Sequence, residues 1–536
     1  MFCKKSALLN FFINIKEKVK ILGEYVLGID GGTESLRAGI FDLKGNIMGL
    51  GFSAYKTYYE HPGWAEQKVE EWRSALIDCI KKSIENSNVN PADIIGIGYD
   101  ATSCTPVFFE ENMEPSRNPI LWMDMRSSEE SQFIESIDDP ARRYNGYGKV
   151  SAEWFPCKVL WVKKNQPEVY RKSKIIAEYT DWLTYELTGK WTLGINTVTL
   201  RGYYDNRNGG FPKEFYNKIG LGDIFEKLPD KVLKLGEVAG LLRKEIAQKT
   251  GLSEGIPVAQ GGSDAGNAVI GLNALKPKQL AYITGSSNLL WGTSNKEFHA
   301  NGLFGTYPDS IIDNTFLIEG GQTSTGSVLK WFKENLVNRA IEDEAAKRNM
   351  GVYDYMDTCA EKIPPGSEGV IVLEHWQGNR TPFVDPFSRG VIRGLSLKHT
   401  SFHIYRAIME GVAYGTEAIM RLINKNSFEI SEVVACGGTT KSKLWLQIYA
   451  DVTGLSIKTT TTTEAAALGS AILGAVAAKK YDSITQAADE MVCFKETITP
   501  DLAAHERYSF FVDQYIDTYL SLKDSMHDTY KNILSL

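Results

Sequence analysis

Three short runs of glycine and hydroxyl residues are the parts of this sequence best suited to hold a phosphate group. They occupy residues 31–33, 285–287 and 437–440, each directly after an apolar run that predicts a β-strand. Glycine lets a backbone bend sharply and approach a ligand closely, and successive backbone N–H groups in such a turn bind anionic oxygens. Any one run could be an ordinary turn. Three of them, spread over both halves of the chain, indicate a nucleotide held across a cleft.

Two aspartates framed by glycines supply the remaining chemistry. Asp30 ends the strand before the first run, where its carboxylate could hold Mg²⁺ through water. Asp264 follows Gly261, Gly262 and Ser263 at the start of an apolar helical stretch, and a helix N-terminus favours the ionised carboxylate. Asp264 could serve only as a helix cap, or it could accept a proton. Phosphoryl transfer needs a phosphate-binding turn, a divalent metal ion and a base in line with the acceptor hydroxyl.

The first run does not fit the two common nucleotide-binding patterns. Residues 28–37 contain neither GxxxxGK[ST] nor a GxGxxG turn that leads from a strand into a helix, because another apolar strand resumes at residues 38–41. The P-loop and the dinucleotide-binding motif are therefore poor descriptions of this site.

The chain as a whole has the composition of a soluble globular protein, with 43% apolar and 23% charged residues. Its 536 residues are too many for one core, so two or more domains are expected. A net charge of −7 without a prominent basic face excludes broad nucleic-acid binding. Seven scattered cysteines without a CxxC pair indicate reduced thiols and a cytoplasmic location. Apolar runs stay shorter than a membrane span.

Residues 1–24 are predicted to be an N-terminal extension. Lys4 and Lys5, followed by an apolar stretch at residues 7–15, imitate a signal peptide. Asn10 and Asn14 interrupt that stretch, and charged residues follow where a small-residue cleavage site should stand. We expect a poorly ordered or loosely docked extension, with a cleaved targeting signal as the alternative.

Apolar periodicity around the motifs predicts two similar α/β halves, although their sequences are too different to prove a duplication. In the first, a three-strand meander precedes a helix over residues 69–84 and a buried strand over residues 94–99, as in a mixed sheet covered by helices. The second half is predicted to contain a strand at residues 280–284, a long helix capped by Thr400, a strand at residues 433–435 and an alanine-rich helix at residues 464–478.

Longer patterns give the chain a family resemblance. Residues 390–395 and, seven residues later, residues 403–410 fit the second signature of the FGGY carbohydrate kinases at every position. The resemblance extends from about residue 25 to about residue 480. Residues 99–104 and 151–161 resemble the ribulokinase branch, but Phe155 departs from the first family signature, which has a small residue or proline there.

This resemblance implies an α/β fold of two actin-like (ribonuclease H-like) domains with an interdomain active-site cleft. It divides the chain into the extension 1–24, an N-terminal domain 25–257 on the sugar and phosphate side, a C-terminal domain 258–500 with the nucleotide and the base, and a C-terminal helical segment 501–536. It implies ATP and Mg²⁺ as cofactors, with Asp264 as general base and Asp30 on the metal side.

The resemblance also distributes residues over the two sides of the cleft. The sugar would contact Ala101 through its backbone, together with Asp124, Arg201, Asp264 and Glu319. The nucleotide would lie against Gly32, Thr33, Ser35, Gly285, Ser286, Gly326, Gly437, Gly438 and Ser442. Arg201 stands where an L-ribulokinase would have lysine, and Ser442 where many relatives have an asparagine near the adenine.

The sequence therefore predicts ATP-dependent phosphorylation of a sugar hydroxyl, with a ribulose-type ketopentose as the favoured acceptor. Xylulose, erythritol, a tetrulose and glycerol are alternative acceptors, but glycerol kinases carry an Arg-Glu pair on the segment that holds Ala101 here. An actin-like ATPase without a sugar substrate is the rival class, and it would have no use for Asp264 and Glu319. The expected partner is a small sugar or polyol, with neither nucleic acid nor membrane, and a homodimer is left open.

Overall fold

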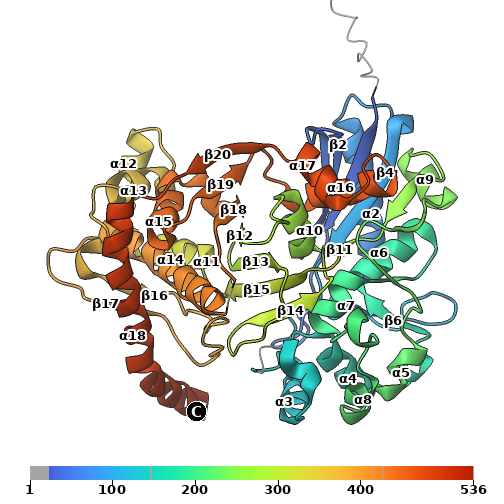
Figure 1. Cartoon of the computed structure of the whole chain (residues 1–536), viewed down its shortest axis with the longest axis horizontal. Coiled ribbons are helices and arrows are strands. Elements are labelled where there is room, and N and C mark those ends of the chain that lie inside the picture. Colours follow the sequence, from blue (N-terminus) through green and yellow to red (C-terminus); the bar gives the residue numbers. More distant parts are fainter. Residues whose placement is uncertain (1–22, 145–147, 427, 535–536) are drawn as a thin grey trace, which may run out of the picture.

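The computed structural model describes residues 23–144, 148–426 and 428–534. Residues 1–22 of the predicted extension lie outside the described residues. Two halves, each built on a seven-stranded mixed sheet, stand side by side (Figure 1).

The first sheet has the strand order β3-β2-β1-β4-β10-β9, with β11 also paired to β4. The predicted meander, helix and buried strand are confirmed, because β1 to β3 are antiparallel, α2 follows and β4 runs parallel to β1. All residues of β1 are buried, as expected for a strand covered on both faces. The bounds are β1 Tyr25–Gly31, β2 Ser35–Asp42, β3 Ile47–Ala54, α2 Val69–Glu85, β4 Ile94–Ala101, β9 Val238–Leu241, β10 Pro257–Ala259 and β11 Gly262–Ser263.

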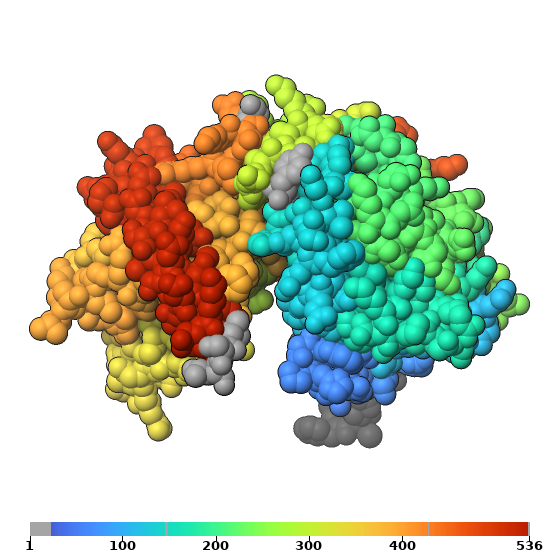
Figure 2. Space-filling model, turned by 90° about the horizontal axis from the view of Figure 1, so that it is seen from below, coloured from blue at the N-terminus to red at the C-terminus, as the bar shows by residue number. Residues whose placement is uncertain are grey.

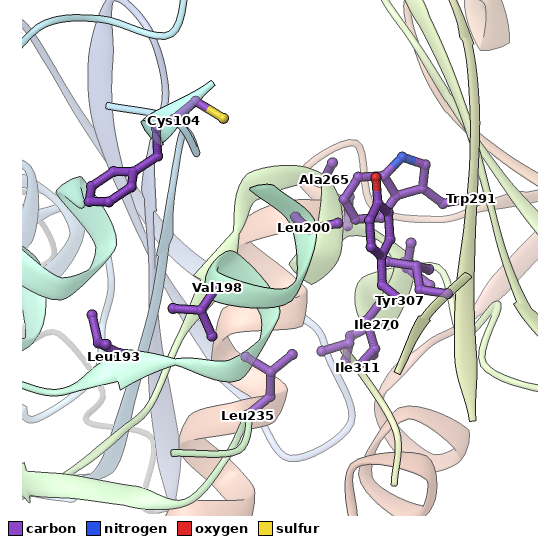
Figure 3. Close-up of a cluster of buried hydrophobic side chains, with 14 of the residues drawn as sticks. Cys104, Leu193, Val198, Leu200, Leu235, Ala265, Ile270, Trp291, Tyr307 and Ile311 are labelled. Carbon is purple, nitrogen blue, oxygen red and sulfur yellow. The ribbon is translucent and has the colours of Figure 1, made fainter. Parts of the chain in front are cut away.

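Between β4 and β9 the chain builds a lobe of short helices and two small sheets, β5-β6 and β7-β8. Its apolar core continues under the floor of the cleft into the second half, where side chains of α7 and α10 meet Trp291 and Tyr307 (Figure 3). The bounds are β5 Pro106–Phe109, α3 Ser128–Ser136, α4 Phe155–Asn165, α5 Pro167–Lys172, β6 Ile175–Glu178, α6 Tyr179–Thr188, β7 Leu193–Gly194, α7 Ile195–Arg201, α8 Lys213–Lys218, β8 Val232–Leu233, α9 Lys244–Thr250 and α10 Asp264–Gly271.

The second sheet has the order β14-β15-β13-β12-β18-β19-β20, and β12 and β18 are its parallel centre. The bounds are β12 Gln279–Thr284, β13 Asn288–Ser294, β14 Phe304–Pro308, β15 Phe316–Gln322, β18 Glu432–Gly437, β19 Ile457–Thr460 and β20 Phe494–Ile498. Beside it lie β16 Ile371–Leu373, β17 Val391–Arg393, α11 Gly326–Leu336, α12 Arg339–Lys347, α13 Val352–Ala360, α14 Ser401–Lys425, α15 Lys443–Thr453 and α18 Leu502–Leu534.

The long helix α14 starts where the sequence predicts. Thr400 is its N-cap residue and forms a capping box with His403, which satisfies backbone N–H groups at the helix start. Gly411 lies so close to β16 that a Cβ there would stand 2.4 Å from the carbonyl oxygen of Val372. A larger residue at this position would therefore push the helix away from β16.

The alanine-rich helix α16 (Ala465–Ala477) belongs to the second half by sequence but packs on β1 and β4 of the first sheet (Figure 1). Helix α17 (Ile484–Met491) packs in turn on α16. Glycines make room for it, because a Cβ at Gly28 would lie 1.9 Å from a backbone oxygen of α16, and one at Gly98 1.8 Å. The predicted boundary between residues 257 and 258 also falls inside β10. Packing around the first sheet therefore draws on both sides of that boundary.

The segment predicted to be helical at the C-terminus is α18, which runs along the outside of the second half (Figure 1). In the described part of the chain, we find no helix that is both long and apolar enough to cross a membrane.

Candidate active site

A cleft of about 870 Å³ separates the two halves, and the space-filling view shows the molecule hollowed between them (Figure 2). Thr33 and Trp122 line it from the first half, and Ser287 and Leu289 from the second. Two of the three predicted glycine and hydroxyl turns therefore contribute a residue to the same space. This arrangement places a ligand in contact with both halves.

Three aspartates lie close together beside the cleft, and one of them, Asp264, lines it. Parallel pairing places Asp100 of β4 opposite Asp30 of β1 and opposite Gly262, two residues before Asp264. Burial raises the pKa of Asp264 to about 7, and the negative charge of Asp30 adds to this effect. Burial also raises the pKa of Asp30 against the opposing influence of Arg37, which lies 3.7 Å away, and raises that of Asp100 further.

Asp264 lines the cleft and is available to a ligand. Ser263, rather than Asp264, is the N-cap residue of α10, because its hydroxyl accepts a hydrogen bond from the Gly266 N–H at 3.1 Å. One oxygen of Asp264, Oδ1, accepts from the Ala265 N–H at 2.8 Å. The carboxylate is thus held by one oxygen, and its raised pKa suits a group that accepts a proton near neutral pH.

An ion pair between residues that line the cleft joins the first half to the second. Nη2 of Arg201, at the end of α7, donates to both carboxylate oxygens of Glu319 on β15, at 2.7 and 2.8 Å. Tyr307 also donates to Glu319, at 3.1 Å. Aromatic rings of Trp154 and Phe304 face the guanidinium, with centroids 5.3 and 5.7 Å away. The pair is fixed in orientation and presents charged hydrogen-bonding groups to the cleft.

Trp291 stands beside this ion pair. It is directly opposite Glu319 in the antiparallel pairing of β13 with β15, so both side chains emerge on the same face of the sheet. Trp291 is buried and lines the cleft, and its indole N–H has no acceptor among the described residues. A buried donor without an acceptor costs free energy, so an oxygen atom of a ligand would be a favourable partner.

Two residues predicted on the sugar side do not present their side chains to the cleft. Asp124 is fully buried, and its oxygens accept from Arg126 at 2.9 and 2.8 Å and from the Ala65 N–H. The Asp124 carboxylate is thus paired with Arg126 and is absent from the cleft lining, and its contact with the sugar stays a prediction. Ala101 is also fully buried at the end of β4. The neighbouring residues Thr102, Ser103 and Cys104 line the cleft instead.

On the nucleotide side, the turns after β12 and β18 are joined. Thr284 pairs with Gly437 across the parallel strands, and the hydroxyls of Thr284 and Thr439 lie 2.6 Å apart. Gly437 has a φ of +93°, and a Cβ there would stand 1.8 Å from the carbonyl oxygen of Thr284, so only glycine fits. A Cβ at Gly438 would meet no protein atom within 4 Å. Gly438 therefore leaves open space beside the turn.

The other predicted nucleotide residues extend this surface. The Gly326 N–H, at the start of α11, donates to the Gly285 carbonyl at 3.1 Å, and the Thr325 N–H to that of Ser286 at 2.9 Å. Ser442 caps α15 and donates to Asp357 at 2.7 Å, so its hydroxyl already has a partner on α13.

The first-half turn faces the cleft from the other side. The Gly32 N–H donates to the Ser35 carbonyl at 3.0 Å, which closes the β1-β2 turn. Thr33 Oγ1 accepts from the Trp122 indole at 3.0 Å, and both residues line the cleft. Gly32, Thr33 and Ser35 are thus brought together with Asp30.

The donor set around Asp30 fits Mg²⁺. Asp30 and Asp100 offer hard carboxylate oxygens, and Oδ1 of Asp100 has no partner among the described residues. Over the described ranges, no group of three or more His, Cys, Asp or Glu side chains is arranged to hold a metal ion alone. Mg²⁺ commonly binds one or two carboxylates together with water and substrate phosphates, and this arrangement is the kind that such a site requires.

Sequence reasoning assigned no role to Asp100 or Trp291. Asp100 directly follows the predicted strand over residues 94–99, and the carboxyl ends of parallel strands meet at one edge of a sheet. The sequence pattern could therefore have placed Asp100 beside Asp30. Trp291 carried no such signal, because its position depends on strand pairing with Glu319.

The sequence of the chain resembles known families and proteins over most of its length. Residues 25–271 match the FGGY family of carbohydrate kinases, N-terminal domain, and residues 280–478 match its C-terminal domain. The chain is 32% identical over 509 residues to a ribulokinase of Geobacillus thermodenitrificans, with 87% of this chain and 89% of the relative covered.

Solved structures show the same architecture. A xylulose kinase from Lactobacillus acidophilus superposes with a TM-score of 0.84 at 20% identity, covering 94% of this chain and all of that one. The glycerol kinase of Plasmodium falciparum with ADP gives 0.81 at 20% identity, covering 93% and 99%.

The predicted class, two actin-like α/β domains with a cleft between them, is confirmed. The chain belongs to the FGGY family of carbohydrate kinases. It is therefore a sugar kinase, a phosphotransferase with an alcohol group as acceptor, and the family uses ATP as phosphate donor.

Proposed function

We propose that this kinase phosphorylates a hydroxyl of a ribulose-type ketopentose, with Asp264 as general base and Asp30 holding Mg²⁺. The observation that carries the proposal is the position of Asp264, which lines the same cleft as Thr33 of the turn after Asp30 and the Arg201–Glu319 pair. Burial keeps the pKa of Asp264 at about 7, close to the pH at which a base is most useful.

The reaction follows from these roles. The acceptor hydroxyl transfers its proton to Asp264, and its oxygen forms a bond to phosphorus while the bond to ADP breaks. Mg²⁺ held by Asp30 would neutralise phosphate charge. The N–H groups of the turns at Gly32, Gly285 and Gly438 would orient the phosphates, because transition-state charge in phosphoryl transfer resides on phosphate oxygens.

The polar groups on the sugar side support a polyhydroxy acceptor. Arg201 and Glu319 supply charged donors and acceptors, and the Trp291 N–H supplies one more donor. Sites built from such groups discriminate strongly against ligands that leave them unpaired. A pentose has more hydroxyls with which to satisfy them than glycerol has. The ribulokinase name of relatives at about 30% identity favours ribulose among the ketopentoses.

Two parts of the expected organisation remain our proposals. We keep the ranges 25–257 and 258–500 as the two domains, with α16 crossing between them. We also keep Gly326 and Ser442 on the nucleotide side, since they adjoin the turns at Gly285 and Gly438.

An ADP-release assay with Mg-ATP and a panel of acceptors tests the proposal. The panel contains D- and L-ribulose, D- and L-xylulose, erythrulose, erythritol and glycerol. We expect a ribulose to give the highest kcat/KM, at least about 100-fold above glycerol, the ratio expected from one or two lost hydrogen bonds. Glycerol or a four-carbon compound as best acceptor would contradict the ribulose assignment. Rapid ADP release that no sugar accelerates would favour an ATPase.

A further inference from the structure

An irregular segment between β16 and β17, residues 374–390, forms one wall of the cleft; we name it the cleft loop. The residues that it contributes to the lining are Gln377, Asn379, Arg380, Val384, Pro386 and Phe387. Arg380 also reaches toward the first half, where its guanidinium lies 3.9 Å from the Glu153 carboxylate. The conformation of this loop therefore shapes the space available to the acceptor.

The loop has little regular structure to hold it in place. Asn379 and Asp385 exchange two backbone hydrogen bonds of 2.8 Å, which form a single isolated bridge. The Thr381 hydroxyl bonds the backbone of Gly321 on β15, with both contacts at 2.7 Å. These bonds link the middle of the loop to itself and to β15, and further contacts come from outside the sheet.

Helix α18 supplies these further contacts. The Asp385 carboxylate accepts hydrogen bonds from Tyr519, at 2.9 Å, and from His527, at 2.7 Å. Phe383 stacks on Tyr519 with ring centroids 3.9 Å apart, and Phe387 packs edge-on against His527. Asp385 is buried, and its two oxygens have separate partners. Oδ1 accepts from the backbone N–H groups of Phe387 and Ser388 within the loop, whereas Oδ2 takes both bonds from α18. The helix therefore satisfies one oxygen of a buried carboxylate.

The loop alternates between the helix and the cleft. Phe383 and Asp385 contact α18, whereas Val384 and Pro386 line the cleft. A displacement of Asp385 therefore moves the two lining residues on either side of it. Figure 1 shows α18 passing the β16–β17 region, and in Figure 2 the helix runs over the second half toward the hollow between the halves.

A second contact involves Tyr515, which lies four residues before Tyr519 in α18. His375, at the start of the loop, bonds Ser388 at 2.7 Å and Tyr515 at 3.0 Å. Tyr515 also donates to Glu374 at 2.9 Å. Glu374 and His375 at the start of the loop are thus bonded to α18, and Ser388 near its end is bonded to His375.

We propose that α18 is a working part of the acceptor site, with Asp385, Tyr519 and His527 as positioning residues that hold the cleft loop against the acceptor. This inference rests on the proposed function for the identity of the acceptor, but not for the anchoring itself. The nucleotide turns at Gly285 and Gly438 lie outside the loop. Loosening the anchor should therefore weaken acceptor binding and leave ATP binding unchanged.

The test compares His527→Ala with two matched variants of the full chain. His527→Gln keeps a side-chain donor for Asp385. His505→Ala removes a histidine from the same helix, but His505 contacts the Asp451 backbone rather than the loop. We expect H527A to raise KM for the best acceptor about tenfold, the effect of one hydrogen bond to a charged group. KM for ATP should change less than twofold, H527Q should restore most of the loss, and H505A should change neither KM.

Hydrogen exchange of the peptide over residues 374–390, measured without substrate, separates the anchor from the acceptor assignment. We expect H527A to speed exchange in this peptide and H505A to leave it unchanged. If no sugar in the panel is phosphorylated by the unaltered protein, the proposed function fails and exchange still tests the anchor. Unchanged exchange in H527A, or equal increases in KM for acceptor and ATP, would overturn the positioning role.

Discussion

The two sheets have the same arrangement at their centres but present opposite chemistry at corresponding strand ends. In each, a group of antiparallel strands is joined to a parallel strand, β1 to β4 in the first sheet and β12 to β18 in the second. The paired ends carry Asp30 and Asp100 in the first sheet, but Thr284 and Gly437 in the second. One arrangement therefore provides a carboxylate edge and a neutral edge beside a single cleft, which Thr33 lines next to the first edge and Ser287 next to the second.

The difference follows from what each edge must bind. Carboxylates repel phosphate oxygens unless a cation lies between them, whereas hydroxyl and backbone N–H groups bind phosphates directly. Burial raises the pKa of Asp30 and Asp100, so a cation bound beside them would favour their ionised forms. The second edge carries no charge at Thr284 and Gly437, so it needs no cation.

The largest expected effect comes from removing the base on the carboxylate side. Asp264→Asn fills the same space but cannot accept a proton, so we expect kcat to fall by about 10²- to 10⁴-fold. Calorimetric titration with ATP should show nearly unchanged affinity, because the nucleotide turns are untouched. Turnover near that of the unaltered protein would remove Asp264 from the mechanism.

The next largest effect is expected from Arg201, whose substitution tests the acceptor side of the cleft separately from the two edges. Arg201→Ala deletes two charged hydrogen bonds to Glu319, so we expect KM for the acceptor to rise roughly 10- to 100-fold. KM for ATP should stay within about twofold. Arg201→Lys keeps the charge without the bidentate geometry, and it should fall between the two proteins. An equal rise in both KM values would show that the pair holds the two halves together instead.

The pH dependence reports the environment of Asp264. Its pKa is raised to about 7 by burial and by Asp30, and only the ionised form accepts a proton. We expect log kcat/KM to fall with a slope approaching one per pH unit as pH drops below about 7. Added Mg²⁺ should move this midpoint to lower pH, because it cancels the charge of Asp30. A pH profile without a break between pH 5 and 8 would contradict the assigned environment.

Much of this arrangement was predictable from local sequence patterns. Apolar periodicity located β1, α2 and β4, and Thr400 marked the start of α14, because strands, caps and helices depend on neighbouring residues. Glycine and hydroxyl runs located the turns. The local pattern did not indicate that the Asp124 side chain would pair with Arg126, two residues away, instead of lining the cleft.

The parts that sequence could not predict depend on distant partners. The alanine-rich pattern of α16 predicted a helix but not the sheet on which it packs. Gly28 and Gly98 leave the space in which the helix packs, but they lie on different strands, and neither glycine alone indicates that a helix lies there. The cleft loop is irregular and takes its shape from α18, more than a hundred residues later in the chain.

The smallest expected effect concerns one donor on the sugar side. Trp291→Phe removes an indole N–H without an acceptor, and we expect KM for the acceptor to rise about five- to tenfold. Trp182→Phe is the control, because Trp182 also has an unpartnered N–H but is buried in the core around the first sheet, away from the cleft. Equal KM values for W291F and the unaltered protein would exclude Trp291 as a ligand donor.

The central claim is the division between a cation-binding edge and a nucleotide-binding edge, and paired titrations of Asp30→Asn and Gly438→Ala test it most directly. Initial rates are measured against Mg²⁺ at saturating ATP and against ATP at saturating Mg²⁺. We expect D30N to raise the Mg²⁺ requirement about tenfold or more with little change in KM for the acceptor. G438A should raise KM for ATP without lowering Tm, since its Cβ meets no protein atom. The division would be contradicted if D30N left the Mg²⁺ requirement unchanged while acceptor affinity collapsed, or if G438A bound ATP as tightly as the unaltered protein.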